Sequence, residues 1–172
     1  NSDGQLGLGN ISSPVPNLSP CPYITSGVDT VAGGHYFTMI IKTDRSLWVV
    51  GNNLYGELGT GDFLSRSIPI QIMTGVSDVS GAGGHITIVK EDGTLWVSGN
   101  NSNGQLGNNN TGVSISTPMQ IMADVAAVSA GWQHTMIIKK DGSLWATGGN
   151  SDGRLGVGDL TDKPVPVPVT TM

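Results

Sequence analysis

The sequence predicts an all-β protein, a β-propeller with four-stranded blades whose ring is incomplete within this chain. Three observations lead to this prediction. The 172 residues contain one pattern that returns at steps of 48 and 49 residues, which indicates a repeat architecture. Short apolar and β-branched segments alternate with Gly, Asn and Asp, as in strands joined by turns. No segment combines helical periodicity with a cap at each end.

Four kinds of residue mark the repeat, namely a tryptophan, the aspartate of the preceding turn, an upstream valine and a downstream glycine. In the three copies these are Trp48, Trp96 and Trp145; Asp44, Asp92 and Asp141; Val31, Val79 and Val128; and Gly56, Gly104 and Gly153. We predict a single partial propeller over residues 1–172. Its repeats are expected at about 14–62, 67–110 and 117–159, with partial copies at 1–13 and 165–172.

Each repeat is expected to contain four strands, and in the second repeat these cover residues 68–73, 76–80, 86–90 and 95–98. The third and fourth strands are joined by Asp-Gly turns, which are typical of hairpins. In the first copy Arg45 replaces the glycine, so we expect a less favourable turn there. The third strands are continuously apolar, which indicates burial on both faces. Together the copies give thirteen strands, three blades and one strand more.

Composition argues against several classes of function. Eight Lys and Arg against thirteen Asp and Glu give a net charge of −5, so no nucleic-acid partner is expected. No apolar run approaches the ~18 residues of a membrane span. The single cysteine, Cys21, lies in a Pro- and Ser-rich stretch expected to form a long loop at 17–27, and it provides neither a disulfide framework nor a thiolate zinc cage. No cofactor is predicted, and aspartates in the Gly- and Asn-rich turns are interpreted as turn residues rather than calcium ligands.

Three segments of the last repeat carry a motif: Ala-Gly-Trp-Gln-His-Thr at 130–135, Lys-Asp-Gly-Ser-Leu-Trp at 140–145 and Gly-Arg-Leu-Gly at 153–156. With their counterparts in the other copies, they resemble the regulator-of-chromosome-condensation repeat family. This resemblance covers the whole chain and implies a seven-bladed propeller, of which about three and a half repeats are present. Ring closure would then need the missing half of a longer protein or a second copy of this chain.

Residues that recur in each copy are interpreted as structural: His85, His134, Trp48, Trp96, Trp145, Gly56, Gly104 and Gly153. The histidines are expected to bond backbone groups near a strand start rather than to act in catalysis or hold a metal. Phe37 takes their place in the first copy. The tryptophans are expected to pack blade against blade. The glycines are expected to allow close approach and positive φ in Asn-containing turns, not to cradle phosphate, because no helix follows them.

Residues that break the repeat in the loops are the candidates for binding. Trp132 stands where the other copies have Gly83 and His35, and a large aromatic residue at a variable loop position suits an interaction anchor. Loops on a rigid scaffold commonly carry binding residues. The predicted rim-loop binding residues are His35, Tyr36, Trp132 and Gln133 on one set of loops and Tyr55 and Asn103 on another.

The predicted function is that of a non-enzymatic scaffold for protein–protein interaction through the rim loops. No catalytic constellation is found in the sequence. Low charge and richness in Gly, Asn and Thr favour a secreted or surface-borne bacterial protein, although the chain shows no signal peptide. Three alternatives remain open: a carbohydrate-binding propeller, a secreted enzyme inhibitor of the β-lactamase-inhibitor type, and a guanine nucleotide exchange factor for a small GTPase.

Overall fold

The computed structural model describes residues 1–7, 23–24 and 26–170. Cys21 and most of the loop expected at 17–27 lie outside these residues. Twelve β-strands in the described part of the chain form three antiparallel sheets of four strands each. The all-β class and the four-stranded blades are therefore confirmed.

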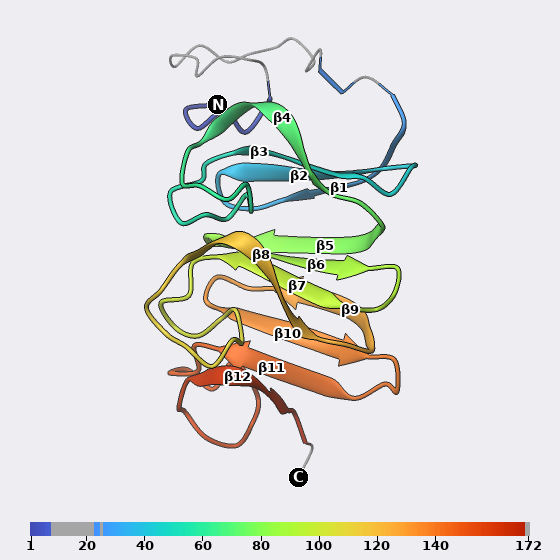
Figure 1. Ribbon diagram of the computed structural model, residues 1–172. Helices are drawn as coiled ribbons and strands as arrows, with labels where there is room; N and C mark the ends of the chain where they lie inside the picture. Colours follow the sequence, from blue (N-terminus) through green and yellow to red (C-terminus); the bar gives the residue numbers. More distant parts are fainter. Residues whose placement is uncertain (8–22, 25, 171–172) are drawn as a thin grey trace.

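Figure 1 shows the three sheets stacked face to face in chain order, with the N-terminal sheet at one end and the C-terminal sheet at the other. The stack is open and does not close into a ring. The first blade consists of β1 (Val28–Gly33), β2 (Phe37–Lys42), β3 (Leu47–Gly51) and β4 (Arg66–Met73); the second of β5 (Val76–Ala82), β6 (His85–Lys90), β7 (Leu95–Gly99) and β8 (Ile115–Met122); the third of β9 (Val125–Ala130), β10 (His134–Lys139), β11 (Leu144–Gly148) and β12 (Lys163–Pro168).

The sequence repeat and the blade differ in phase by one strand. The strand at 68–73 was expected to open a blade, but β4 pairs with β3, with Ile70 opposite Val49, and closes the first blade. A periodic pattern fixes the length of the repeat and not the strand at which a sheet begins, so this expectation was wrong. The thirteenth expected strand would belong to the repeat beginning at 14, before residue 23, and falls outside the described residues.

Burial differs between the middle blade and its neighbours. Five consecutive residues of β6, from His85 to Val89, are buried, as predicted for a strand covered on both faces. In β2 and β10 buried residues alternate with more exposed ones, because each of these strands has a neighbouring blade on one face only. Two apolar clusters fill the spaces between the first and second blades and between the second and third blades.

The repeated tryptophans lie on the third strand of each blade at one register, each opposite an isoleucine of the second strand. Trp96 packs against the apolar cluster between the first two blades, and Trp145 against the next cluster. Each indole Nε1 donates a hydrogen bond to the hydroxyl two residues earlier, at 2.9 Å. For Trp96 and Trp145 the predicted packing of blade against blade is thus observed.

The hairpin turns between the second and third strands show the expected difference between copies. Gly93 and Gly142 both have φ of 83°, while Arg45 at the same place has φ of 64°. A non-glycine residue in this left-handed region is strained. Arg45 is held there by an ion pair with Asp29 at 2.6 Å.

In the first and second blades, the long loop between the third and fourth strands lies on the outer strand of the following blade. Gly56 of the first blade approaches β8 so closely that a Cβ there would lie 2.5 Å from the Cα of Ser116. Gly104 makes the same approach to Pro164 of β12, at 2.7 Å. Both glycines also have positive φ, as the sequence predicted.

A buried asparagine organises each of these loops from within. The side-chain oxygens of Asn53, Asn101 and Asn150 accept hydrogen bonds from backbone N–H groups five residues later, at 2.9 to 3.0 Å. All three asparagines are fully buried. The loops therefore hold their shape without regular secondary structure, and they present their variable residues on a fixed frame.

Candidate functional site

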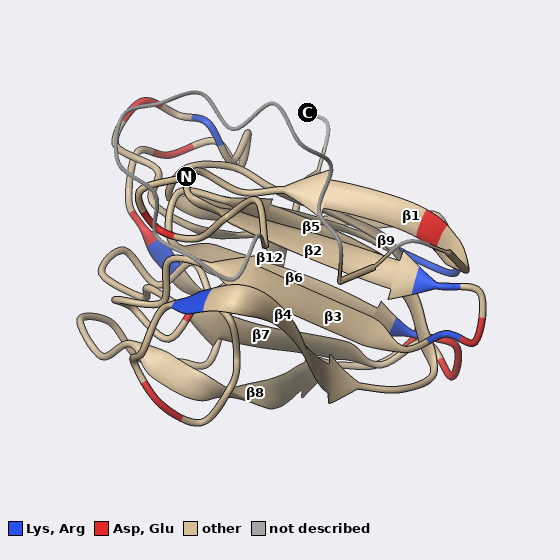
Figure 2. Cartoon of the chain, turned by 90° about the horizontal axis from the view of Figure 1, so that it is seen from above, with Lys and Arg blue, Asp and Glu red and all other residues tan. Residues whose placement is uncertain are grey.

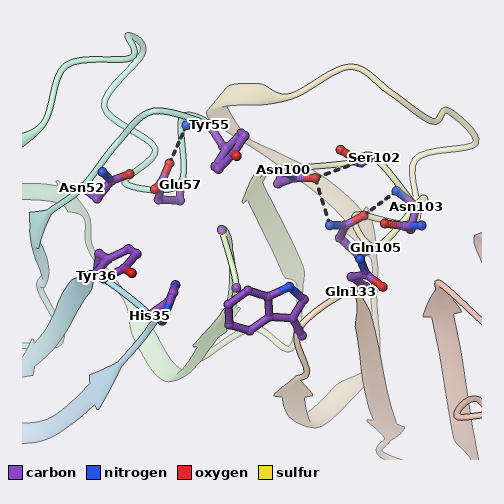
Figure 3. A pocket seen from close by; sticks show the side chains of 13 residues that line it. His35, Tyr36, Asn52, Tyr55, Glu57, Asn100, Ser102, Asn103, Gln105 and Gln133 are labelled. Atoms are coloured by element: carbon purple, nitrogen blue, oxygen red, sulfur yellow. Dashed lines mark hydrogen bonds between the residues drawn. The ribbon is translucent and has the colours of Figure 1, made fainter.

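One pocket of about 240 Å³ lies where loops of all three blades meet. In an antiparallel four-stranded blade, the loop after the first strand and the loop after the third strand fall at the same end. The pocket is built from both kinds of loop, and Figure 3 shows side chains from several loops around it. The fold thus gathers, at one end of the stack, residues that are far apart in the sequence.

All six residues predicted as rim-loop candidates line this single pocket: His35, Tyr36, Tyr55, Asn103, Trp132 and Gln133. The sequence had assigned them to two separate sets of loops, which the structure brings together. Tyr36, Tyr55 and Trp132 are 46%, 47% and 57% exposed. Their role in binding stays a prediction, and their placement makes it testable at one site.

Three aromatic side chains form a connected group on one side of the pocket. The rings of His35 and Tyr36 lie 3.8 Å apart between centroids. The ring of His35 also meets the indole of Trp132 edge-on, at 4.7 Å and an angle of 64°. Contacts of this kind hold aromatic rings in place, here across the first and third blades.

Two glycines of the second blade make this convergence possible. Gly83 and Gly84 stand where the first blade has His35 and Tyr36. A Cβ at Gly84 would lie 2.7 Å from the ring of Tyr55, and a Cβ at Gly83 would collide with the carbonyl oxygen of Trp132. Side chains at either position would occupy the space of the pocket. The pocket is therefore open because both positions are glycine.

Glu57 is the functional candidate that sequence reasoning missed. It lines the pocket and is only 2% exposed. Its Oε2 accepts a hydrogen bond from the backbone N–H of Tyr55 at 2.7 Å, drawn as a dashed line in Figure 3. Burial raises the pKa of the Glu57 carboxyl above its usual value, backbone N–H groups oppose this, and the charge of Asp3 adds a small rise. The signal in the sequence was that this loop position holds Gln105 in the next blade.

Amide side chains form the other side of the pocket. The Oδ1 of Asn100 accepts hydrogen bonds from the Nε2 of Gln105 at 3.1 Å and from the backbone N–H of Ser102 at 2.8 Å. The Oε1 of Gln105 accepts one from the backbone N–H of Asn103 at 2.9 Å. Gln133 is in contact with Arg154, whose Nη1 lies 3.4 Å from its Oε1. The pocket therefore combines aromatic faces, amides and one buried carboxylate.

The cations of the chain lie away from Glu57. All eight Lys and Arg belong to described residues, and none of them lines the pocket. Four are in ion pairs with other acids: Arg45, Arg66, Arg154 and Lys163. Figure 2 shows charged residues of both signs in the loops and strand ends, with the middles of the strands uncharged.

The recurring histidines take structural positions, with one difference from expectation. His85 is fully buried at the start of β6, and its Nε2 lies 3.0 Å from the hydroxyl of Thr135 in the third blade. That hydroxyl donates to the carbonyl of Gln105 at 2.8 Å, so the His85 Nε2–H is the donor. The Nε2 partner is thus a side chain of the next blade, while a backbone interaction with Ala82 has a small opposing effect on the pKa of the ring. Burial lowers the pKa of His85 to about 4, with a smaller contribution from the charge of His134.

His134, at the same position of the third blade, faces the open side of the stack, where no further blade is described. Burial lowers its pKa, helped by the nearby charge of Arg154. Its buried Nδ1 has no hydrogen-bond partner among the described residues. No group of three or more His, Cys, Asp or Glu side chains in the described part could hold a metal ion. Nor does that part contain a helix able to cross a membrane.

Family models match the C-terminal half of the chain. The model described as "Regulator of chromosome condensation (RCC1) repeat" matches residues 92–138 and 141–172. A second model with the same description matches residues 125–154. These matches cover the second hairpin of the second blade and the whole third blade.

Solved structures share the fold at low sequence identity. Prp20p, the RCC1 protein of Saccharomyces cerevisiae, matches at 19% identity with a TM-score of 0.85, over 100% of this chain and 45% of its own. The structure of the yeast protein bound to Kap60 matches with a TM-score of 0.84 and 19% identity. The match covers 98% of this chain and 43% of the yeast chain. Human WBSCR16 matches at 18% identity with a TM-score of 0.64. The match covers 99% of this chain and 61% of WBSCR16. The chain spans less than half the length of Prp20p.

The three stacked four-stranded sheets are blades of a β-propeller whose ring is open within the described residues, with a pocket formed by their loops. The repeat matches and the structural likeness to Prp20p make the identification more specific. Residues 92–138 and 141–172 match the RCC1 repeat, and the whole chain shares the fold of Prp20p.

Proposed function

We propose that this chain binds a protein partner through the pocket formed by the rim loops of its three blades. One observation carries the proposal: His35 and Tyr55, from two loops of the first blade, and Trp132 of the third blade line one pocket beside Gly83 and Gly84 of the second blade. Exposed aromatic residues around a concave site are typical of interaction hot spots. The partner, the remainder of the ring, and a secreted or surface location all stay predictions.

A library of random peptides displayed on phage, selected on the immobilised chain, tests this proposal. The affinities of the selected peptides are then measured for Trp132→Ala and Tyr55→Ala. Phe63→Ala is the matched control, because Phe63 is an aromatic residue of the same loop region, 50% exposed and outside the pocket. We expect at least about tenfold weaker binding for the first two variants and no change for the control.

Unchanged binding to both pocket variants would overturn the proposal. An equal loss with Phe63→Ala would do the same, because it would show that any exposed aromatic residue of these loops suffices. Circular dichroism of the three variants checks that each retains the β-sheet signal of the parent chain.

Carbohydrate binding is the second candidate, and the composition of the pocket favours it. Aromatic rings beside amide side chains, such as Asn100, Asn103 and Gln105 next to Tyr55, can stack on sugar rings and bond their hydroxyls. A glycan array separates the two functions, because a sugar ligand that competes with the selected peptides would replace the protein partner as the main candidate.

Nucleotide exchange on a small GTPase, and enzyme inhibition, stay as alternatives without a specific observation in their favour. Prp20p has been studied for its binding to Gsp1p and histones, and this chain matches less than half of it. A nucleotide-release assay with a labelled guanine nucleotide tests the first alternative directly.

A further inference from the structure

The feature that the proposed function leaves unexplained is the carboxylate of Glu57. Its side chain is almost completely buried, and among the described residues no Lys or Arg forms an ion pair with it. A buried ionised carboxylate normally has a cationic partner, because the loss of hydration is otherwise not compensated. All eight Lys and Arg belong to described residues and none lines the pocket, so the basic side chains of the chain leave this carboxylate without an ion-pair partner.

The surroundings of Glu57 fit a planar cation. The exposed rings of Tyr36, Tyr55 and Trp132 line the same pocket, and the face of such a ring attracts a cation. The side-chain amides of the opposite wall supply further acceptors (Figure 3). A guanidinium group stacks on aromatic faces and presents five N–H donors to carboxylate and amide oxygens, which an ammonium group does not.

The size of the pocket limits the ligand. About 240 Å³ is below the ~300–1,000 Å³ typical of sites for drug-sized molecules. The pocket therefore suits one long side chain of a larger partner rather than a whole small molecule. Asp3 reinforces the negative charge: its Oδ1 accepts a hydrogen bond at 2.9 Å from Asn52, another lining residue.

We propose that the pocket receives the guanidinium group of an arginine side chain, with Glu57 as its ion-pair partner and the rings of Tyr55 and Trp132 as its stacking surfaces. The inference rests on the proposed function and gives the chemistry of the partner at the same site. Arg154 contacts Gln133, forms an ion pair with Asp152 and is not among the residues that line the pocket, so it does not occupy this place.

Two short peptides of equal shape test the inference. Acetyl-Gly-Arg-Gly-amide is titrated into the chain, and the indole N–H resonance of Trp132 is followed by NMR. Acetyl-Gly-citrulline-Gly-amide has the same length without the charge. We expect the arginine peptide to bind at least tenfold more tightly than the citrulline peptide, in the millimolar range of a single side chain.

Variants then locate the charge that is recognised. Glu57→Gln keeps the shape of the side chain and matches Gln105 of the next blade, so it is expected to fold, and it should weaken the arginine peptide at least fivefold. Glu91→Gln removes one negative charge from an exposed hairpin outside the pocket and should have no effect. Equal binding of both peptides, no shift with either peptide, or an equal loss in both variants would overturn the inference.

The library selection distinguishes this inference from the proposed function. Selected peptides that lose binding with Trp132→Ala and Tyr55→Ala, lack arginine and ignore Glu57→Gln would overturn the arginine site and leave the protein-binding function standing. Peptides indifferent to all three variants would overturn both.

Discussion

The two interfaces between blades differ at one register position. Between the first and second blades, Phe37 fills this position and packs so closely on Gly81 that a Cβ there would lie 2.8 Å from its ring. Between the second and third blades, His85 fills it and bonds the Thr135 hydroxyl. The same backbone arrangement thus accepts an apolar contact or a hydrogen bond. Because a histidine titrates and a phenylalanine does not, we expect protonation of this residue to destabilise only the second kind of interface.

A second difference is that the middle blade is covered on both faces and the first blade on one. A matched pair of substitutions tests this difference and should give the largest effect. Ile88 of β6 is fully buried, and Ile40 occupies the same register in β2 on the open face of the first blade. Ile88→Ala should lower the free energy of unfolding by about 2–5 kcal/mol, because a cavity remains. Ile40→Ala should cost about 1 kcal/mol or less. Urea denaturation measures both, and equal losses would mean that the first blade is covered in solution.

The titration of His85 predicts how the stability of the second interface changes with pH. Its pKa of about 4 in the folded chain, against 6.5 for an unperturbed histidine, means that the unfolded chain takes up a proton at higher pH. This contribution to stability is complete above pH 6.5 and is lost as the pH falls to 4, a change of about 3 kcal/mol. In His85→Gln, unfolding free energies measured from pH 7.5 to 4 should lose this slope. A slope equal to that of the parent chain would assign the effect to other groups.

Thr135 tests the hydrogen-bonded interface from its other side. Thr135→Val keeps the shape of the side chain but leaves the Nε2–H of His85 and the carbonyl of Gln105 without their shared partner. We expect a loss of about 1–3 kcal/mol in unfolding free energy. Thr38→Val is the matched control, because Thr38 donates to the Gln5 carbonyl at 2.9 Å at a less buried site. A comparable loss there would contradict the special role of the His85 interface.

The smallest expected effect concerns the hairpin turns. Arg45→Gly should relieve the strain at φ of 64°, a gain of about 1 kcal/mol. It should also remove an exposed ion pair with Asp29, a loss of about 0.2–1 kcal/mol. The net change in melting temperature is therefore expected to be zero or slightly positive. A fall of several degrees would show that the ion pairs of Arg45 matter more than its backbone.

Much of this structure follows from the spacing of residues in the sequence. The recurring tryptophans, glycines and Asp-Gly turns predict the blades, because each has one local geometric role that repeats. The starting strand of a blade could not be predicted, since β4 has the same apolar pattern whichever sheet it joins. Burial of every residue was predicted for β2, β6 and β10, the third strands of the sequence repeats. It holds only for β6, because β2 and β10 each have a described blade on one face only.

The pocket was predictable in its residues and not in its shape. Tyr55 and Trp132 were recognised because they break the repeat. Tyr55 and Trp132 can line one pocket because Gly83 and Gly84 of the second blade have no side chains. A single sequence does not show that these two glycines border the same pocket. Glu57 could have been found by comparing the copies, because this loop position changes from Glu57 to Gln105 to Arg154 while the glycine and leucine beside it recur.

The long loops of the first and second blades each contact the following blade, so cleavage of such a loop has a consequence beyond its own blade. A protease cut between residues 54 and 55 would leave the four strands of the first blade paired, yet it would loosen the loop that Gly56 presses onto β8 of the second blade. In the third blade, the corresponding glycine Gly153 approaches Leu160 of its own loop, and no strand of the described residues lies against it. Cleavage of this loop in the first blade is therefore expected to weaken its contact with the second blade, the next one toward the C-terminus.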